Sequence, residues 1–91
     1  MAPEKIRDCA GRIRLLLTEL RLLPPDSQIG DSNSLFDASV LDSLRLMELV
    51  PPLEQRFGIR VDIEDLTPDN FDSLETIAGF VVRKTGAADA R

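Results

Sequence analysis

Apolar residues recur every three or four positions along most of this chain, and this spacing limits the structures it can form. The first such stretch covers residues 4–22, where the apolar side chains fall on one side of a helix. Two further stretches with the same spacing cover residues 43–57 and 72–85. Leucine dominates their composition and favours helix over sheet. The sequence therefore predicts an all-α protein built from amphipathic helices.

The length is sufficient for one small domain with a single core. Because the 91 residues include no Trp or Tyr and only four Phe, that core must be mainly aliphatic. We expect a single domain over residues 1–85. Residues 86–91 offer no apolar anchor, so we expect them to form a flexible tail.

Proline and glycine mark the predicted ends of the helices. Pro24 and Pro25 end the first helix, since neither can donate a helical hydrogen bond. Residues 23–42 form a long loop, and its apolar residues predict that it packs across the helices. Gly58 stops the second helix. Residues 59–63 alternate like a strand, but a single strand has nothing to pair with, so we predict an extended linker.

The composition excludes several classes of function. The chain has no histidine and only one cysteine, Cys9, so no Ser-His or Cys-His pair can form and no metal site is expected. Cys9 cannot form an internal disulfide, which fits a reducing compartment. Its position beside Ile6 and Ile13 predicts either a small hydrophobic side chain or a partly exposed thiol. The net charge of −5 argues against nucleic acid as a partner.

The apolar run nearest the N-terminus is too short for a signal segment or a membrane span. It covers residues 15–17 and is interrupted by Glu19. We therefore expect a cytoplasmic protein with no membrane partner, and a monomer.

Ser43 is the residue best placed for a chemical role. It stands between Asp42 and Leu44 at the start of the second predicted helix, where its hydroxyl faces solvent on a rigid support. Nothing nearby can activate that hydroxyl, because histidine is absent. We interpret Ser43 as a residue that another enzyme modifies.

A second Asp-Ser-Leu tripeptide, at residues 72–74, is explained by structure alone. Asp72 predicts the N-cap of the last helix, and Glu75 three residues later completes a capping box. Capping explains the first copy less well, because Arg45 places a cation near the positive end of the helix dipole.

The second predicted helix carries more apolar residues than one buried face needs. The inward stripe consists of Leu46, Leu49, Val50, Leu53 and Phe57. Leu44, Met47 and Pro51 follow a different side, next to Ser43. Such residues predict either a wider core or a docking surface. The spacing slightly favours the core for Leu44 and docking for Met47 and Pro51.

Four ordered stretches of this chain are similar to one known family. They are Leu-Phe-Asp-Ala-Ser-Val-Leu-Asp-Ser-Leu at 35–44, Glu-Leu-Val at 48–50, Leu-Glu-Gln-Arg-Phe-Gly-Ile at 53–59 and Asn-Phe-Asp-Ser-Leu-Glu-Thr-Ile at 70–77. Together they resemble the acyl carrier and peptidyl carrier proteins. The resemblance implies a four-helix bundle with a long loop between helices 1 and 2 and a short helix 3, for which residues 64–66 are the candidate helical turn.

The resemblance also implies a function without catalysis. Ser43, flanked by Asp42 and Leu44, would receive a covalent 4′-phosphopantetheine arm from coenzyme A, installed by a phosphopantetheinyl transferase. The residues facing partner enzymes would be Leu44, Met47, Glu48 and Pro51. We expect a freestanding carrier that holds an aminoacyl or small acyl group as a thioester. An adenylate-forming ligase would load it, and downstream enzymes would use the cargo.

The charge of the second helix favours a specialised biosynthetic pathway. Its acidic and basic residues nearly balance, whereas carriers of general fatty acid synthesis are usually far more acidic here. Fatty acid or polyketide synthesis is the alternative within the class, and a continuous cavity between the helices would favour it. A helical protein-interaction module without an arm is the alternative from a different class.

Two features depart from the family pattern. Ser39 stands where the family often has glycine, so either φ is negative there or a modest strain is tolerated. Pro51 and Pro52 lie in the middle of the second helix, and each removes one helical hydrogen bond. We predict a kink near Val50, or a break with Pro51 starting a new segment.

Overall fold

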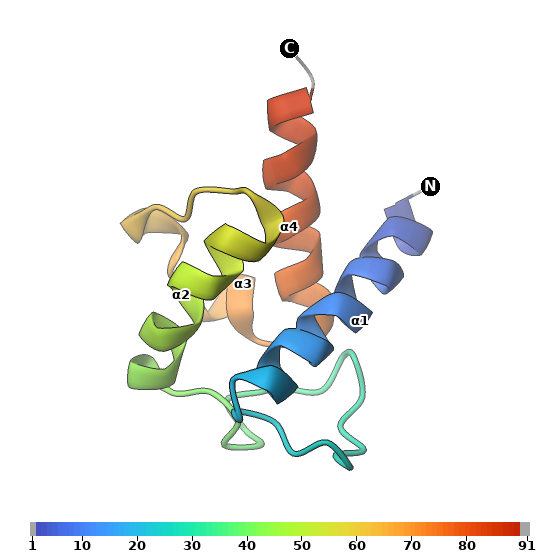
Figure 1. Cartoon of the computed structure of the whole chain (residues 1–91), viewed down its shortest axis with the longest axis vertical. Helices are drawn as coiled ribbons and strands as arrows, with labels where there is room; N and C mark the ends of the chain where they lie inside the picture. The colour runs from blue at the N-terminus through green and yellow to red at the C-terminus, as the bar shows by residue number, and fades with distance from the viewer. Residues whose placement is uncertain (1, 90–91) are drawn as a thin grey trace.

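In the computed structural model, residues 2–89 fold into four α-helices and one short 3₁₀ helix (Figure 1). The backbone is described for residues 2–89 and the side chains for residues 6–85. The elements are α1 (Ala2–Glu19), α2 (Ser43–Phe57), η1 (Ile63–Asp65), α3 (Pro68–Phe71) and α4 (Leu74–Asp89). No strand occurs in residues 2–89. The predicted all-α fold with four helices is therefore confirmed, including the long loop after the first helix. A short third helix is present too, but at residues 68–71 and not at the predicted residues 64–66.

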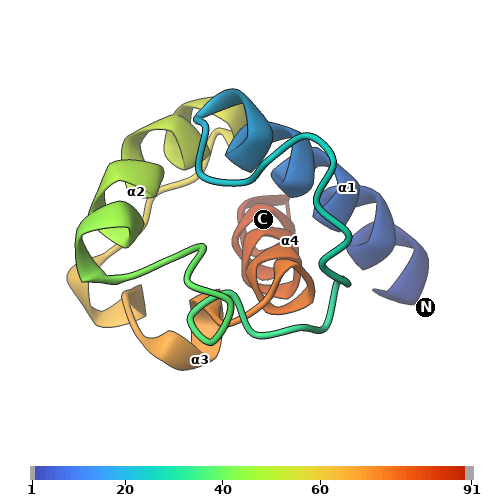
Figure 2. The ribbon, with the colours of Figure 1, turned by 90° about the horizontal axis from the view of Figure 1, so that it is seen from below.

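The helix α4 lies at the centre of the fold. Viewed along its axis, α1 and α2 pass on opposite sides of it, α3 lies beside its start, and the loop between α1 and α2 crosses the near end (Figure 2). Both α1 and α3 pack against α4. The radius of gyration is 12.3 Å, close to the value of about 12 Å expected for a compact chain of this length.

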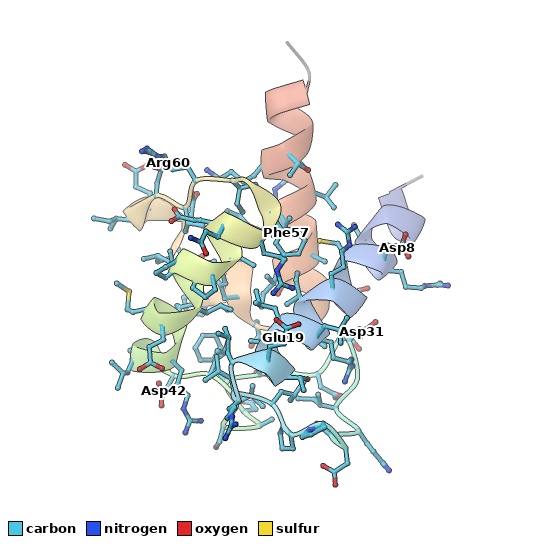
Figure 3. All side chains as sticks on the ribbon, viewed as in Figure 1. Asp8, Glu19, Asp31, Asp42, Phe57 and Arg60 are labelled. Atoms are coloured by element: carbon cyan, nitrogen blue, oxygen red, sulfur yellow. The ribbon has the colours of Figure 1, made fainter. Side chains whose placement is uncertain are left out.

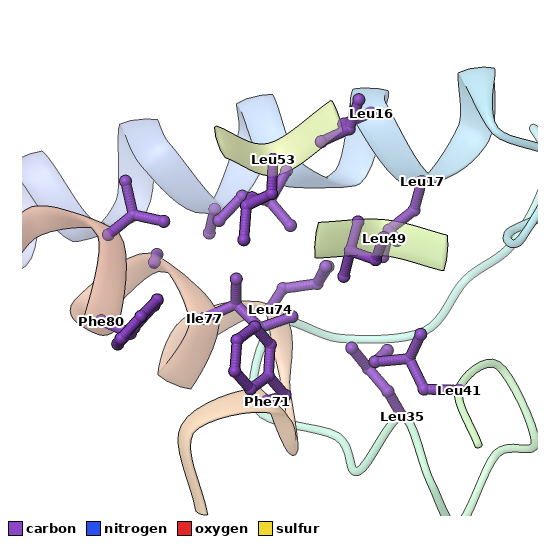
Figure 4. Close-up of a cluster of buried hydrophobic side chains, with 14 of the residues drawn as sticks. Leu16, Leu17, Leu35, Leu41, Leu49, Leu53, Phe71, Leu74, Ile77 and Phe80 are labelled. Carbon is purple, nitrogen blue, oxygen red and sulfur yellow. The ribbon is translucent and has the colours of Figure 1, made fainter. Parts of the chain in front are cut away.

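The core is mainly aliphatic, as the composition predicts. Its fully buried side chains come from all four helices and from the long loop, and include Ile13, Leu17, Leu35, Leu41, Leu49, Leu53, Phe71, Leu74 and Ile77 (Figure 4). The rings of Phe71 and Phe80 have centroids 5.4 Å apart and are tilted by 52°, a favourable aromatic arrangement. The loop prediction is confirmed, because Leu35, Val40 and Leu41 are buried.

Hydrogen bonds fix the long loop to helices on both sides of it. The Arg14 guanidinium in α1 donates through Nη2 to the Ile29 carbonyl at 2.6 Å and to Asp31 Oδ1 at 3.0 Å. Farther along, the Leu35 N–H donates to the carbonyl of Asp72, just after α3. The loop is therefore a structural layer that closes one end of the core and leads the chain to the start of α2.

A left-handed residue, and not the prolines, ends α1. Arg21 has φ of 64°. Its N–H donates to the Thr18 carbonyl at 3.0 Å, and the Leu22 N–H donates to the Leu17 carbonyl at 2.9 Å. This pair of bonds is a Schellman motif. The helix stops at Glu19, so the prediction that Pro24 and Pro25 end it at residue 22 is wrong.

The two prolines leave α2 unbroken. One α-helix runs from Ser43 to Phe57 with Pro51 and Pro52 inside it (Figure 1), so the predicted break is wrong. The predicted kink near Val50 stays a prediction. The carbonyls that lose a donor belong to Met47 and Glu48, four residues earlier, and both residues are exposed. Water can bond these carbonyls, which lowers the cost of the prolines.

The ends of α2 and η1 agree with the sequence more closely. Gly58 ends α2 in the left-handed conformation with φ of 63°, as predicted. Residues 59–62 form no regular structure, in agreement with the predicted linker. The predicted turn at residues 64–66 is found one residue earlier, as η1. The sequence reasoning missed α3, although Thr67 followed by Pro68 is a standard way to begin a helix.

The last helix begins two residues later than predicted. The Ser73 N–H donates to Thr76 Oγ1 at 2.8 Å, and the Thr76 N–H donates to Ser73 Oγ at 3.1 Å. This reciprocal pair resembles a capping box. Asp72 instead follows α3 as its C-cap. The prediction of an Asp72 N-cap with Glu75 as its partner is therefore wrong.

The far end of α4 extends beyond its predicted limit near Thr85 and reaches Asp89. The tail predicted at residues 86–91 lies outside the described side chains, and its last two residues lie outside the described backbone. None of the helices described here is both long enough and apolar enough to cross a membrane.

Candidate attachment site

Ser43 is the first residue of α2, and its side chain is exposed. Figure 3 labels Asp42 beside this end of α2 and Phe57 at the opposite end of the helix. The first backbone hydrogen bond of the helix is donated by the Leu46 amide to the Asp42 carbonyl, at 2.8 Å. Within the described part of the chain, the amides of Ser43 and Leu44 have no acceptor. Unpaired amides and the positive end of the helix dipole favour an anion at this position.

Asp42 caps α2 with its side chain. Its backbone is extended, with φ of −145°, and its Oδ1 accepts a hydrogen bond from the Arg45 N–H at 2.8 Å. This bond corrects the interpretation that capping explains the first tripeptide less well than the second. Among the residues whose side chains are described, none forms a hydrogen bond with the Ser43 hydroxyl. The Asp42 carboxylate is thus committed to the helix start, and the serine remains unactivated.

The second serine of the same tripeptide is not accessible. Ser73 is only 3% exposed, and its hydroxyl takes part in the α4 cap with Thr76. The interpretation of this copy as structural therefore agrees with the fold. Two identical tripeptides have opposite environments because one precedes a helix on the surface and the other joins two helices inside.

The turn ahead of the site contains the second left-handed residue that is not glycine, after Arg21. Ser39 has φ of 62°. Its N–H donates to the Phe36 carbonyl at 3.1 Å, and the Val40 N–H donates to the Leu35 carbonyl at 2.8 Å, which completes another Schellman motif. Of the two alternatives for Ser39, a positive φ with tolerated strain is the one found.

This turn explains why an arginine can stand at position 45, near the positive end of the helix dipole. Its Nη1 donates to the Ser39 carbonyl at 2.9 Å. The guanidinium therefore reaches back past the helix start to the preceding turn. Sequence reasoning noted the unfavourable cation but missed this role, because the partner is a backbone carbonyl whose orientation no residue pattern reveals.

The apolar side chains next to Ser43 face outward. Leu44 is 69% exposed and Met47 is 57% exposed, so the core alternative for Leu44 is wrong. Glu48 and Pro51 are exposed as well. On the inward side, Leu46, Leu49 and Leu53 are buried, while Val50 and Phe57 are partly buried. The exposed face defined by Leu44, Met47, Glu48 and Pro51 is called the outer face of α2 below.

An ion pair anchors η1, which follows the linker after α2, to α4. Lys84 Nζ lies 2.8 Å from Asp65 Oδ2 and 3.6 Å from Asp62 Oδ2. The hydrogen bond from Lys84 lowers the pKa of Asp65, and the same bond raises the pKa of Lys84. An open hollow of about 790 Å³ lies nearby, lined by Glu54 and residues 59–64. It lies beside the linker after α2, so it is not the cavity between helices that would favour a long acyl chain.

The single thiol has no visible role in this site. Cys9 is 7% exposed in α1, which supports the small-hydrophobe alternative. Burial raises the pKa of this thiol, and the Arg12 guanidinium opposes that change. Among the side chains of residues 6–85, no group of three His, Cys, Asp or Glu is arranged to hold a metal ion.

Comparison with known proteins identifies the family. Residues 13–81 match the family described as a phosphopantetheine attachment site. The D-alanyl carrier proteins of Streptococcus sanguinis, Streptococcus gordonii and Streptococcus thermophilus are each 44% identical to this chain over 53 residues. The alignment covers 58% of this chain and 67% of each relative. The chain therefore belongs to the phosphopantetheine-attachment family of carrier proteins, which are not enzymes and which carry a covalently attached 4′-phosphopantetheine.

Proposed function

We propose that Ser43 is the residue to which the 4′-phosphopantetheine arm is attached. It is the exposed serine at the N-terminus of α2, inside the matched residues 13–81. Ser73, in the same tripeptide, is buried in the α4 cap. The contrast in accessibility between these two serines is the observation that carries the proposal.

The surroundings of Ser43 suit the phosphate of the arm. The amides of Ser43 and Leu44 are unpaired within the described residues, and the first turn of α2 contains no acidic residue. The nearest carboxylate, that of Asp42, accepts from the Arg45 amide. A negative phosphodiester on Ser43 would therefore meet amide donors and the positive end of a helix of 15 residues.

Ser43 needs to be reachable but not reactive. When bound, the arm supplies a terminal thiol that holds the cargo as a thioester. The chain has no histidine to act as a base, so the phosphopantetheinyl transferase must activate the hydroxyl during attachment. The rigid helix start holds the serine in place for that enzyme.

We further propose that the cargo is an aminoacyl or small acyl group. The similar streptococcal proteins are D-alanyl carriers. From Asp42 to Phe57 the charges nearly balance, with Asp42, Glu48 and Glu54 against Arg45 and Arg56. The carrier domain covers residues 1–85. An adenylate-forming ligase loads it, and enzymes of a specialised biosynthetic pathway take the cargo. It works as a monomer in the cytoplasm, where coenzyme A and ATP are available.

The outer face of α2 is the proposed partner-binding surface. Leu44 and Met47 expose large apolar side chains directly after Ser43, and Glu48 and Pro51 extend the same exposed side. An apolar patch beside an attachment point can dock the enzymes that must reach the arm.

Intact-mass measurement tests the attachment site. The purified protein is incubated with coenzyme A, Mg²⁺ and a broad-specificity phosphopantetheinyl transferase. We expect one added arm in the wild type and in Ser73→Ala, and none in Ser43→Ala. A wild-type protein that stays unmodified, while a known carrier in the same reaction is modified, would favour an interaction module without an arm.

A second measurement tests the cargo. The modified protein is incubated with ATP and adenylate-forming ligases specific for different amino acids, D-alanine included, and separately with enzymes that load fatty or malonyl groups. We expect a thioester mass only with a ligase that activates an amino acid or a small acid. Selective loading with a long acyl or malonyl group would contradict the proposed cargo.

A further inference from the structure

The turn that precedes the attachment site holds a residue in an unfavourable conformation. Ser39 has φ of 62°, in the left-handed region where a side chain is strained and where glycine is usual. The turn is nevertheless well defined on its inner side. Val40 and Leu41 are buried, and their amides donate to the Leu35 carbonyl at 2.8 Å and 3.1 Å.

Arg45 connects this turn to the start of α2. Its amide donates to Asp42 Oδ1 at 2.8 Å, and its guanidinium donates to the Ser39 carbonyl at 2.9 Å. Arg45 follows Ser43 in the chain, and its two hydrogen bonds go to Asp42 and Ser39, which precede Ser43. If Ser39 moved to a negative φ, its carbonyl would turn, and this charge-assisted bond would be lost.

We propose that Arg45 is a positioning residue for the modification of Ser43. Its guanidinium holds the left-handed turn at Ser39 and so fixes residues 40–42, from which Ser43 is presented. The inference rests on the proposed attachment of the arm at Ser43. In effect, an arginine in the helix compensates for a turn residue that is not glycine.

The consequence concerns the rate of attachment. The Ser43 hydroxyl must come within bonding distance of coenzyme A in the transferase, and small displacements of a reacting group slow such a step. Without Arg45 the turn can exchange between conformations, which moves the start of α2 relative to the core. A glycine at position 39 adopts the same turn unaided, so it should make the arginine unnecessary.

A double-mutant cycle tests this prediction. The kcat/KM of the transferase is measured with the wild type, Arg45→Met, Ser39→Gly and the double variant as substrates. Loss of one exposed charged hydrogen bond predicts that Arg45→Met slows modification by about three- to tenfold. In the Ser39→Gly background the same substitution should cost less than about twofold, because glycine does not need the bond. Arg56→Met removes the same charge at the far end of α2, and we expect it to leave the rate within about twofold of the wild type.

Amide hydrogen exchange gives a readout that does not depend on the transferase. Exchange at Val40 and Leu41 should become faster in Arg45→Met and return to the wild-type rate in the double variant. An equal loss of kcat/KM in both backgrounds would mean that the guanidinium contacts the transferase directly, which overturns the positioning role. Unchanged amide exchange in Arg45→Met would overturn it as well.

The two proposals fail in different ways. If the wild type is not modified at Ser43, the proposed function is wrong. If the wild type is modified and Arg45→Met is modified equally fast, only the positioning role of Arg45 is wrong.

Discussion

Lys84 in α4 and Asp65 in η1 form an ion pair, with 2.8 Å between Lys84 Nζ and Asp65 Oδ2. Lys84 also lies over the ring of Phe80, 5.6 Å from its centroid. The linker after α2 has no regular structure of its own, and this lysine connects η1 directly to the central helix.

The ion pair predicts how stability depends on pH. The pKa of Asp65 is lowered from 3.8, so the contribution of the pair is present above pH 3.8 and is lost as the pH falls through the lowered value. The pKa of Lys84 is raised from 10.5, so the contribution is complete below pH 10.5 and is lost as the pH rises through the raised value. We expect Lys84→Met to lower the Tm at neutral pH.

Thermal unfolding at several pH values checks this prediction. The difference in Tm between the wild type and Lys84→Met should shrink at pH values below the lowered pKa of Asp65. Arg83→Met is the comparison, since Arg83 is exposed and forms one long hydrogen bond of 3.4 Å to Asn70 Oδ1 among the described side chains. Its charge also lowers the pKa of Asp65, but less than Lys84 does, so a smaller effect is expected. A Tm difference that persists unchanged in acid would assign the effect of Lys84 to packing on Phe80.

Glycine at the two left-handed positions should stabilise the protein. Ser39 and Arg21 have φ of 62° and 64°, and a side chain in this region costs about 1–2 kcal/mol. Part of the gain is lost because glycine makes the unfolded chain more flexible. We therefore expect Ser39→Gly and Arg21→Gly each to raise the free energy of unfolding by about 0.5–1 kcal/mol.

Denaturation with urea measures both variants. We expect gains of similar size, because the φ values are nearly equal and the Arg45 guanidinium can bond the residue-39 carbonyl with either side chain. Destabilisation in both variants would mean that the left-handed turns carry no strain that glycine can relieve.

Replacing the exposed proline of α2 should also stabilise the fold. Pro51→Ala restores an amide that can donate to the Met47 carbonyl, and Pro51 is exposed, so little packing is lost. We expect the free energy of unfolding to rise by about 1–3 kcal/mol. The half-buried Pro52 offers a comparison, because Pro52→Ala restores a bond but removes some contacts. A loss of stability in Pro51→Ala would indicate that α2 is built around its prolines.

Substitution of the two Asp-Ser-Leu serines should have different effects: one should lower stability and the other should prevent modification. Ser73→Ala removes the hydroxyl that accepts from the Thr76 amide, and loss of such a cap costs about 1 kcal/mol. Ser43→Ala removes an exposed hydroxyl with no partner among the described side chains, so it should change stability by less than about 0.5 kcal/mol. Urea denaturation and intact mass, measured on the same samples, should therefore give opposite rankings. A large loss of stability in Ser43→Ala would mean that this serine is structural.

The long helices and the core could be predicted from the sequence because their signals are local. The three- and four-residue spacing in α1, α2 and α4 places the apolar residues on one side, and it correctly placed Leu49 and Leu53 in the core. The proposed role of Ser43 came from the absence of any base and from the family resemblance. Its exposure agrees with that interpretation.

The errors concern choices that distant residues decide. Both Asp72 and Ser73 can cap a helix, and the choice follows from Ser34, which donates to Asp72 Oδ1 at 2.6 Å from 38 positions earlier in the chain. Spacing could not place Leu44 either, because it lies in the first turn of α2, at the edge of the helix contacts. Likewise, no pattern in the sequence reports the orientation of the Ser39 carbonyl that Arg45 binds.

The prolines of α2 have a consequence for recognition. In the middle of an ordinary helix, each backbone carbonyl accepts a hydrogen bond from an amide of the same helix. A protein that binds such a helix therefore contacts mainly its side chains. Here the carbonyls of Met47 and Glu48 have no amide four residues ahead, since those positions are Pro51 and Pro52. Both residues lie on the outer face. Two main-chain carbonyls without a helical donor therefore belong to the proposed partner-binding surface, and substitution of the side chains around them would not remove them.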